Sequence, residues 1–312
     1  MIEVRNLVKK YGDHYAVNDI SFTVEKGKIY GFLGPNGAGK STVMNIVTGY
    51  ISATSGHVSI NGHDILEEPQ EAKKCIGYLP ELPPLYFDMT VEEYLKFVCE
   101  IKNVPKDKIH DETYAVMEKT DIVPMKNRLI RNLSKGYRQR VGLSQALIGD
   151  PEVVILDEPS VGLDPQQIIE MRELIKGLEK EKTVILSSPI LSEVSAICDM
   201  ILIVNEGKLV AADTPENLGA LVSDTQRIEI TVLSDPEKAA ETMKQVEGIS
   251  YAVSPASDGK CKIFIKGRDS AEIRTAVSEA LLNARIPITD MTTHSATLED
   301  IFLKLTNGGE SN

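Results

Sequence analysis

The fold of this chain is decided by a short segment, residues 29–42, which reads IYGFLGPNGAGKST. Its first part, Ile29 to Leu33, is apolar and of strand length, and its second part is rich in glycine and ends in Lys40, Ser41 and a threonine. Apolar residues then recur at helical spacing. A strand, a glycine-rich loop and a helix in this order match the pattern GxxxxGK[ST] in the context that this pattern requires. The segment therefore predicts an α/β fold with a phosphate-binding loop.

We expect this loop to bind a nucleoside triphosphate. Glycines allow backbone N–H groups to surround phosphates at a helix N-terminus. Lys40 would reach the terminal phosphates, and the hydroxyl of Ser41 would be a ligand of Mg²⁺. The alternative is a glycine-rich turn without a ligand, which the strand and helix on either side disfavour. The predicted nucleotide contacts are Gly34, Pro35, Asn36, Gly37, Ala38, Gly39, Lys40, Ser41 and Thr42.

Two carboxylates form a second candidate site. Asp157 and Glu158 come directly after the apolar run Val153 to Leu156, and α/β folds bind ligands at the carboxyl ends of such strands. We expect Asp157 to hold hydrated magnesium and Glu158 to orient and deprotonate an attacking water. Acids after a strand also serve as helix caps. Here, however, Asp164 before Pro165 is the better cap for the next helix.

A third motif lies just before the apolar run that begins at Val153. There the chain reads LSKGY from Leu133 and continues into Gln139 and an arginine. It is similar to the LSGGQ signature, and with the two motifs above it makes residues 1–220 resemble the ATP-binding cassette of ABC transporters. Lys135 and Tyr137 depart from the consensus, whereas the serine and the second glycine remain. The resemblance implies a P-loop ATPase that uses ATP and Mg²⁺.

The same resemblance implies that the ATP sites are shared between two cassettes. Ser134, through its hydroxyl, and Gly136, through its backbone, would contact the γ-phosphate of ATP held by a partner cassette. Residues 161–164, Val-Gly-Leu-Asp, look like the loop by which two cassettes sense each other; a simple turn is the alternative. Tyr11 matches the aromatic residue that stacks on adenine, and a plain strand tyrosine is the alternative.

Two positions depart from the family pattern. Glu81, after Leu79-Pro80, stands where the family usually has a glutamine, and it could still reach magnesium while adding a negative charge. Pro189 stands where the family has a switch histidine between the γ-phosphate and the catalytic glutamate. The loss of this donor predicts slow hydrolysis with ordinary ATP binding, unless Ser187 or Ser188 already senses the γ-phosphate.

The pattern of elements predicts two domains. Residues 1–222 form the cassette, with an antiparallel β annex and a helical subdomain at about residues 85–147. Thr90 and Glu93 are spaced as a capping box at the start of that helical part. Residues 223–312 follow the order strand, helix, strand, strand, helix, strand, which resembles a small ferredoxin-like α+β domain. A last helix is expected from Thr297 to Thr306.

The composition restricts the functional classes. The chain has 312 residues and a net charge of −12, which would repel nucleic acid, and no run of Lys and Arg compensates it. Its apolar stretches fall far short of the roughly 20 residues of a spanning helix, and its start lacks the features of a secretory signal. We therefore expect a cytoplasmic protein that does not bind nucleic acid.

Cysteine and histidine spacing predicts no metal site. The four cysteines are widely separated, which favours free buried thiols: Cys75, Cys99, Cys198 and Cys261. His57 and His63 flank a predicted hairpin turn at Asn61-Gly62. No cysteine or third histidine lies within ligand spacing of them, so we expect solvated hairpin residues.

The tail from Leu298 to Leu305 and the glutamate after Leu79-Pro80 resemble those of cassettes that serve drug, antibiotic and lipid-like exporters. The predicted function is an ATP-hydrolysing subunit, peripheral on the inner face of the cell membrane, that powers an exporter. Its partners would be a separate multi-spanning membrane subunit and a second cassette, identical or different. A slowly hydrolysing regulatory subunit and a soluble ABC ATPase acting on ribosomes or DNA are the alternatives.

Overall fold

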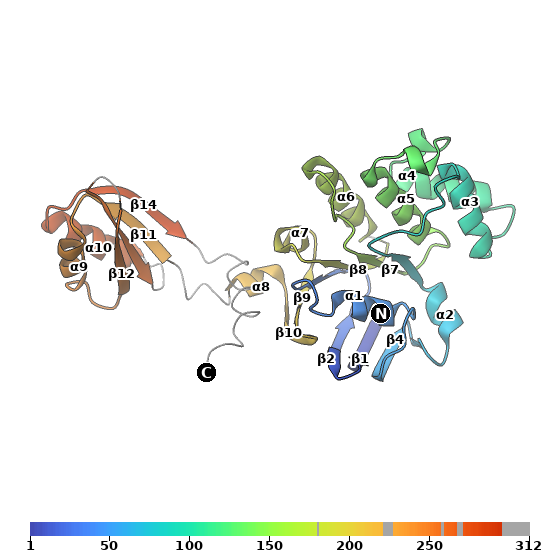
Figure 1. Ribbon diagram of the computed structural model, residues 1–312, viewed down its shortest axis with the longest axis horizontal. Coiled ribbons are helices and arrows are strands. Elements are labelled where there is room, and N and C mark those ends of the chain that lie inside the picture. Colours follow the sequence, from blue (N-terminus) through green and yellow to red (C-terminus); the bar gives the residue numbers. More distant parts are fainter. Residues whose placement is uncertain (180, 221–226, 257–258, 267–270, 295–312) are drawn as a thin grey trace. The chain divides into compact units, whose positions relative to one another are not determined.

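The chain divides into two compact units, Met1–Thr214 and Pro215–Asn312, whose elements are labelled in Figure 1. The sequence pattern places this boundary eight residues later, after residue 222. The predicted last helix, Thr297 to Thr306, lies outside the described residues. The computed structural model describes residues 1–179, 181–220, 227–256, 259–266 and 271–294.

The first unit contains two sheets. A four-stranded antiparallel sheet has the order β2-β1-β4-β5 and consists of β1 Ile2–Tyr11, β2 His14–Val24, β4 Ser55–Ile60 and β5 His63–Asp64. A six-stranded sheet has the order β10-β9-β3-β8-β7-β6 and consists of β3 Ile29–Leu33, β6 Ile76–Leu79, β7 Val153–Asp157, β8 Thr183–Ser188, β9 Met200–Asn205 and β10 Lys208–Asp213. Only β10 runs antiparallel to its neighbour in this sheet.

The central strands of the parallel sheet explain why the sequence shows continuous apolar runs. Every residue of β3, β7 and β8 is buried, because a parallel sheet is covered on both faces. The register pairs Leu33 with Ser188 and Asp157 with Ser187. The carboxyl ends of three neighbouring strands therefore meet at one edge of the sheet, where the glycine-rich loop begins.

One hydrophobic core joins the two sheets of this unit through α1 (Lys40–Val47). Leu7 of the antiparallel sheet, Met44 of α1 and Phe32 of β3 each have no solvent exposure. The hairpin between β4 and β5 turns at Asn61 (φ 51°) and Gly62 (φ 91°), as the Asn-Gly pair predicts. The antiparallel annex is thus packed onto the helix that carries the phosphate-binding motif.

Between β6 and β7 the chain is helical. Helices α3, α4 and α5 pack on one another and cluster in Figure 1. At the start of α3, Thr90 and Glu93 form the predicted capping box. The elements here are α3 Val91–Ile101, α4 Ile109–Lys119, the 3₁₀ turns Val123–Met125 and Ile130–Asn132, and α5 Lys135–Leu147. The remaining helices of the first unit are α2 Pro69–Lys74, α6 Pro165–Leu178 and α7 Leu191–Ser195.

The second unit has its own core. Its four-stranded antiparallel sheet has the order β12-β13-β11-β14. Side chains of the sheet and of the two helices α9 and α10 enclose that core, among them Ile230, Ile263, Val277 and Leu281. The elements are α8 Pro215–Ala220, β11 Arg227–Val232, α9 Pro236–Met243, β12 Ser250–Pro255, β13 Cys261–Lys266, α10 Ala271–Asn283 and β14 Ile288–His294.

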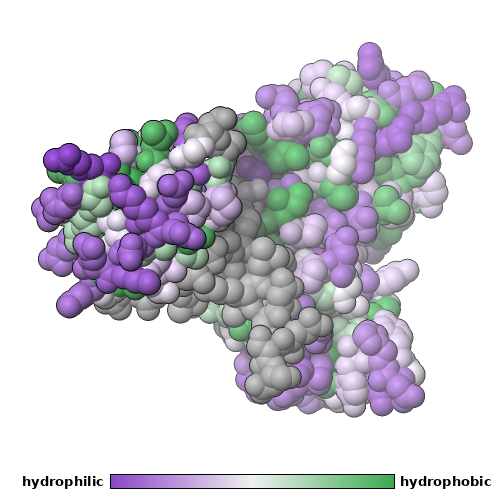
Figure 2. Space-filling model, turned by 60° about the vertical axis from the view of Figure 1, so that its left-hand side comes forward, coloured by the Kyte–Doolittle hydropathy of each residue, from purple (hydrophilic) through white to green (hydrophobic). Residues whose placement is uncertain are grey.

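The surface drawn in Figure 2 mixes polar and apolar side chains. Across the described ranges, no helix combines the length and the hydropathy that crossing a membrane requires. All four cysteines are free thiols; Cys75 is half-buried and the other three are buried.

Candidate functional site

The glycine-rich loop connects β3 to α1 and has the backbone that its glycines predict. Gly37 (φ 83°) and Gly39 (φ 104°) have left-handed conformations, which glycine adopts without the steric penalty of a Cβ. A Cβ at Gly39 would lie 2.4 Å from the carbonyl oxygen of Ala16 in β2. Glycine is therefore required at position 39 both by conformation and by the close approach of the annex.

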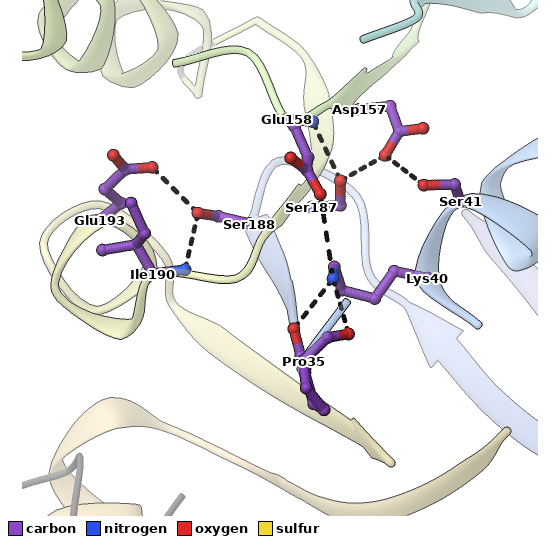
Figure 3. A network of polar contacts seen from close by, with 10 residues as sticks. Pro35, Lys40, Ser41, Asp157, Glu158, Ser187, Ser188, Ile190 and Glu193 are labelled. Carbon is purple, nitrogen blue, oxygen red and sulfur yellow. Dashed lines mark hydrogen bonds and ion pairs between the residues drawn. The ribbon is translucent and has the colours of Figure 1, made fainter. Parts of the chain in front are cut away.

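Lys40 is the first residue of α1, and its side chain is only 4% exposed. Its Nζ donates hydrogen bonds to the carbonyl oxygens of Gly34 (2.9 Å) and Pro35 (3.2 Å) and lies 3.9 Å from Glu158 Oε1 (Figure 3). Burial lowers the pKa of Lys40, and the carboxylates of Glu158 and Asp157 partly oppose this shift. The amine is thus held inside the loop beside a carboxylate.

Asp157 ends β7 and is 4% exposed. Its Oδ1 accepts hydrogen bonds from Ser41 Oγ (3.2 Å) and from Ser187 Oγ (2.5 Å). Ser41 comes from α1 and Ser187 from β8, so three elements converge on one carboxylate oxygen (Figure 3). Mg²⁺ binds to oxygen ligands, commonly one or two carboxylates, and P-loop proteins add a serine or threonine hydroxyl.

Glu158 has an unusual backbone. Its φ is 48°, a conformation that is uncommon for residues other than glycine and that the surrounding structure must enforce. Its backbone N–H donates to Ser187 Oγ (3.0 Å). Burial raises the pKa of the Glu158 carboxyl; Lys40 lowers it, and the carboxylates of Glu81, Asp157 and Glu193 raise it further. A raised pKa makes this carboxylate a better proton acceptor.

Lys40, Ser41 and Glu158 line a hollow of about 290 Å³, which we call the polar hollow; Asp157 lies behind Ser41 and does not line it. The predicted residues that line it are Asn36, Gly37, Gly39, Lys40, Ser41, Thr42, Glu81 and Glu158. Ala16 of β2 also lines it, although nothing in its local sequence distinguishes this alanine. The geometry brings a lysine, a hydroxyl and two carboxylates to the edge of a parallel sheet, which suits phosphate binding and attack by an activated water.

Comparisons with known proteins agree with this geometry. Residues 17–161 match the family model described as ABC transporter. The chain is 34% identical to the bacitracin transport ATP-binding protein of Bacillus licheniformis, over 99% of this chain and 98% of that protein. This chain belongs to the ATP-binding subunits of ABC transporters.

Two further likenesses support this assignment of the cassette. The linearmycin resistance ATP-binding protein of Bacillus subtilis (strain 168) is 30% identical, with 98% of each chain covered. Among solved structures, cbiO1 from Clostridium perfringens, part of the ABC transporter complex cbiONQ, has a TM-score of 0.65 and 26% identity, over 70% of this chain and 90% of that one. The protein is therefore an ABC-family ATPase subunit with an α/β cassette and an additional C-terminal antiparallel sheet.

The LSKGY motif of this ABC cassette starts helix α5 away from the polar hollow. Ser134 is the exposed N-cap of the helix, and its hydroxyl accepts a hydrogen bond from the backbone N–H of Tyr137 (3.4 Å). Gly136 is buried, and a Cβ there would lie 2.6 Å from Gln167 Oε1 of α6. Neither Ser134 nor Gly136 lines the hollow that contains Lys40.

Tyr11 also lies outside the lining of the polar hollow. It ends β1, is 52% exposed, and has Lys9 Nζ 5.1 Å from its ring centroid.

Asp164 caps α6 by accepting a hydrogen bond from the backbone N–H of Gln167 (2.9 Å), as its place before Pro165 predicts.

The two hairpin histidines each lie beside one carboxylate. His57 Nδ1 lies 3.8 Å from Asp64 Oδ2, and His63 Nδ1 lies 3.3 Å from Glu68 Oε2. Within the described part of the chain, no group of three or more His, Cys, Asp and Glu side chains is arranged to hold a metal.

The local sequence does not predict the contacts of Ser187 and Glu193. The sequence indicates for Ser187 only a role as a sensor of the γ-phosphate. In the structure its hydroxyl donates a hydrogen bond to Asp157 and accepts one from the backbone N–H of Glu158. Glu193 of α7 accepts hydrogen bonds from Ser160 and Ser188. The serine pair after the strand is the available signal, but only the strand register shows what these hydroxyls contact.

Proposed function

We propose that this cassette binds and hydrolyses Mg-ATP and, by closing on a second cassette, powers a membrane exporter. The observation that carries the proposal is the convergence of Lys40, Ser41 and Glu158 at one hollow while Ser134 and Gly136 lie outside it. A site built only from residues of one chain would bring both groups together. Their separation favours two half-sites that are completed across a dimer.

ATP would bind with its phosphates in the glycine-rich loop. The backbone of residues 34–42 would surround them, with Lys40 as the charge that compensates them. The amine already lies at hydrogen-bond distance from two loop carbonyls, so binding would exchange these partners for phosphate oxygens. Tyr11, whose ring is half exposed, would stack on the adenine.

The oxygen donors of the hollow suit magnesium. Ser41 Oγ and Asp157 Oδ1 lie 3.2 Å apart, and Glu81 lines the same hollow. These three residues would hold Mg²⁺, directly or through its waters. The ion would neutralise charge on the phosphates. The hydroxyl of Ser187 would keep Asp157 oriented toward it.

Glu158 would orient and deprotonate the attacking water. Its raised pKa and its place beside Lys40 fit a general base at the terminal phosphate. Pro189 follows Ser188 at the end of β8 and provides no side-chain donor. This difference from histidine favours slow hydrolysis and thereby a second candidate function, an ATP-binding subunit that acts mainly by binding.

A second cassette would complete the site. The N-terminus of α5 carries the exposed Ser134, and a helix N-terminus attracts phosphate. Ser134 and the backbone of Gly136 would contact the γ-phosphate of the partner's ATP. Residues 161–164 would lie at the same interface and report its closure to Glu158.

The membrane subunit would dock on a second hollow of about 580 Å³, which we call the apolar hollow. Tyr50 and Leu82 line it and are 79% and 78% exposed, a degree of exposure that suits a protein interface. One relative by structure, cbiO1, is part of a transporter complex. The cassette would therefore lie on the cytoplasmic face of the cell membrane, bound to a multi-spanning subunit.

Export, as opposed to import, is favoured by relatives whose names refer to bacitracin transport and linearmycin resistance.

For the second unit we propose a ferredoxin-like fold. Its strand order β12-β13-β11-β14, with a helix after the first and the third strand in sequence, is the order in which two split β-α-β units interleave.

The test has two parts. Purified full-length protein is assayed for ATP hydrolysis with and without Mg²⁺ and with EDTA; activity that persists without the metal contradicts the magnesium assignment. The protein is then co-expressed, carrying an affinity tag, with the products of the neighbouring reading frames and purified from solubilised membranes, where we expect a multi-spanning membrane protein to be recovered with it. Recovery with ribosomes or DNA, and not with membranes, would contradict the exporter proposal.

A further inference from the structure

Glu193 is a buried carboxylate that the proposed mechanism does not use. It lies in the first turn of α7 and is 7% exposed. Its Oε2 accepts hydrogen bonds from Ser160 Oγ (2.5 Å) and from Ser188 Oγ (2.9 Å). Among the described residues, no Lys, Arg or His forms an ion pair with Glu193. Burying a carboxylate without a cation is costly, and the two hydroxyls offset part of this cost at Oε2.

The two hydroxyls come from two different segments of the site, the loop after Glu158 and the end of β8. Ser160 is 9% exposed and follows Glu158 by two residues; Ser188 is 2% exposed and precedes Pro189. The Ser188 hydroxyl also accepts a hydrogen bond from the backbone N–H of Ile190 (3.0 Å), the residue after Pro189 (Figure 3). Glu193 thus joins the loop after the predicted base to the end of β8, directly before the position that lacks the switch histidine.

The loop after β7 needs such a support. Glu158 has a φ of 48°, and a strained residue keeps its conformation only where its surroundings enforce it. Before the strained residue, Ser187 holds the backbone N–H of Glu158. Beyond it, the N–H of Val161 donates to the carbonyl of Glu158 (3.1 Å), and Ser160 is held by Glu193. The conformation is therefore fixed on both sides.

Helix α7 is a rigid base for this contact. Val194, the residue after Glu193, has no solvent exposure. A Cβ at Gly31 of β3 would lie 2.1 Å from Val194 Cγ1, so the helix rests directly on the strand that leads into the glycine-rich loop. Helix α7 therefore packs against the strand without space for a larger residue at position 31.

We propose that Glu193 is a positioning residue that, by accepting hydrogen bonds from Ser160 and Ser188, fixes the loop after Glu158 to the end of β8, directly before Pro189. This connection, which we call the lock, keeps Glu158 aimed at the polar hollow where Pro189 provides no histidine side chain to bridge the two segments. This inference rests on the proposed ATPase function, and it assigns Glu193 no contact with ATP.

The test compares Glu193→Ala and Glu193→Gln with Ser192→Ala, an exposed residue of the same helix. We expect Glu193→Ala to lower kcat about 10- to 100-fold, since small misplacement of a reacting group has effects of this size, and to leave KM for ATP within about twofold. Glu193→Gln keeps a carbonyl oxygen as acceptor and should recover most of the loss. The control should match wild type. An unchanged kcat in Glu193→Ala overturns the proposal.

A double-mutant cycle separates positioning from general destabilisation. If Glu193 acts through the hydroxyl of Ser160, then Ser160→Ala combined with Glu193→Ala should be no worse than Glu193→Ala alone. Fully additive losses overturn the proposal. Should Glu193→Ala fail to fold, the variant carrying both Ser160→Ala and Ser188→Ala removes the same two hydrogen bonds and should lower kcat alone.

Amide hydrogen exchange tests the lock without any ATPase assay. In Glu193→Ala, exchange should rise together in residues 158–163 and at Ile190, while β3 stays protected. No rise in either loop overturns the proposal. If wild-type protein hydrolyses no ATP but exchange rises as expected, the proposed ATPase function fails and the lock stands.

Discussion

The polar hollow and the apolar hollow lie on either side of one short loop, and they differ in what they can bind. The polar hollow, about 290 Å³, is lined by Lys40, Ser41, Glu81 and Glu158. The apolar hollow is about 580 Å³ and is lined largely by aromatic, aliphatic and proline side chains: Tyr50, Ile76, Tyr78, Pro80, Leu82 and Pro84, with Asn45, Lys102, Gln145 and Ala146. Fixed charges at strand ends suit chemistry, whereas exposed apolar side chains suit a protein surface.

The loop between the hollows contributes to both. Glu81 lines the polar hollow, and its neighbours Pro80 and Leu82 line the apolar one. Gln139 of α5 donates a hydrogen bond from Nε2 to the carbonyl of Glu81 (3.3 Å). A displacement of this loop would thus change the lining of both hollows and the contact with α5, the helix that begins within LSKGY. The comparison predicts that chemistry and docking can be damaged separately by mutation.

The largest effect is expected from Glu158→Gln, which removes the predicted base and keeps its shape. We expect kcat to fall about 10²- to 10³-fold and the cassettes to remain as a dimer in Mg-ATP, because ATP is bound but not consumed. ATPase assays and sizing chromatography measure the two outcomes. The matched control is Glu173→Gln, an exposed glutamate of α6. A Glu158→Gln profile that stays monomeric at high protein concentration counts against the shared site.

Lys40→Ala removes the cation that, in the proposed function, would face the phosphates. Loss of one preorganised electrostatic interaction lowers rates about 10²- to 10³-fold, and nucleotide binding should weaken as well because the same amine would hold the ground-state phosphates. Lys26→Ala is the control, since that side chain is 74% exposed. ATPase within about twofold of wild type in Lys40→Ala would show that the activity arises elsewhere.

Leu82→Asp tests the apolar hollow. An aspartate buried without a partner at an interface should weaken binding of the membrane subunit at least about tenfold, while the ATPase activity of the isolated cassette stays near that of wild type. Co-purification with the co-expressed membrane subunit measures the binding. Leu66→Asp is the control, because Leu66 is 59% exposed and lines neither hollow. Equal effects of both substitutions would remove the distinction between the hollows.

The smallest change is expected from Pro189→His, which restores a donor in the loop after β8. We expect kcat to rise about tenfold with little change in KM, the pattern of an interaction that forms only in the transition state. Steady-state kinetics at several ATP concentrations provide both values. If kcat does not change while the protein remains folded, Ser187 or Ser188 already fulfils this role.

Much of the fold could be predicted from contiguous residues. The buried strands appear as apolar runs, the glycine-rich loop as a fixed spacing, and the caps at Thr90 and Asp164 as local patterns. These signals are informative because the residues of each pattern are close together in the sequence. The local secondary structure alone therefore sets their relative positions. The predicted chemistry of Lys40, Ser41 and the two carboxylates depends on this kind of information.

The sequence by itself thus determined the class of ligand and the order of the elements. The tertiary structure alone decided that Ser41 and Ser187 donate to the same oxygen of Asp157 and that Glu158 has a left-handed backbone. It also decided that Glu193 joins the loop after Glu158 to the end of β8. The hydrogen bonds to Asp157 and the one from Ser160 to Glu193 connect residues about 30 or more positions apart in the chain. The bond between Asp157 and Ser187 depends on the register of β7 and β8, and the other two depend on how α1 and α7 pack on the strands. The packing of the whole core sets both, and no local pattern does.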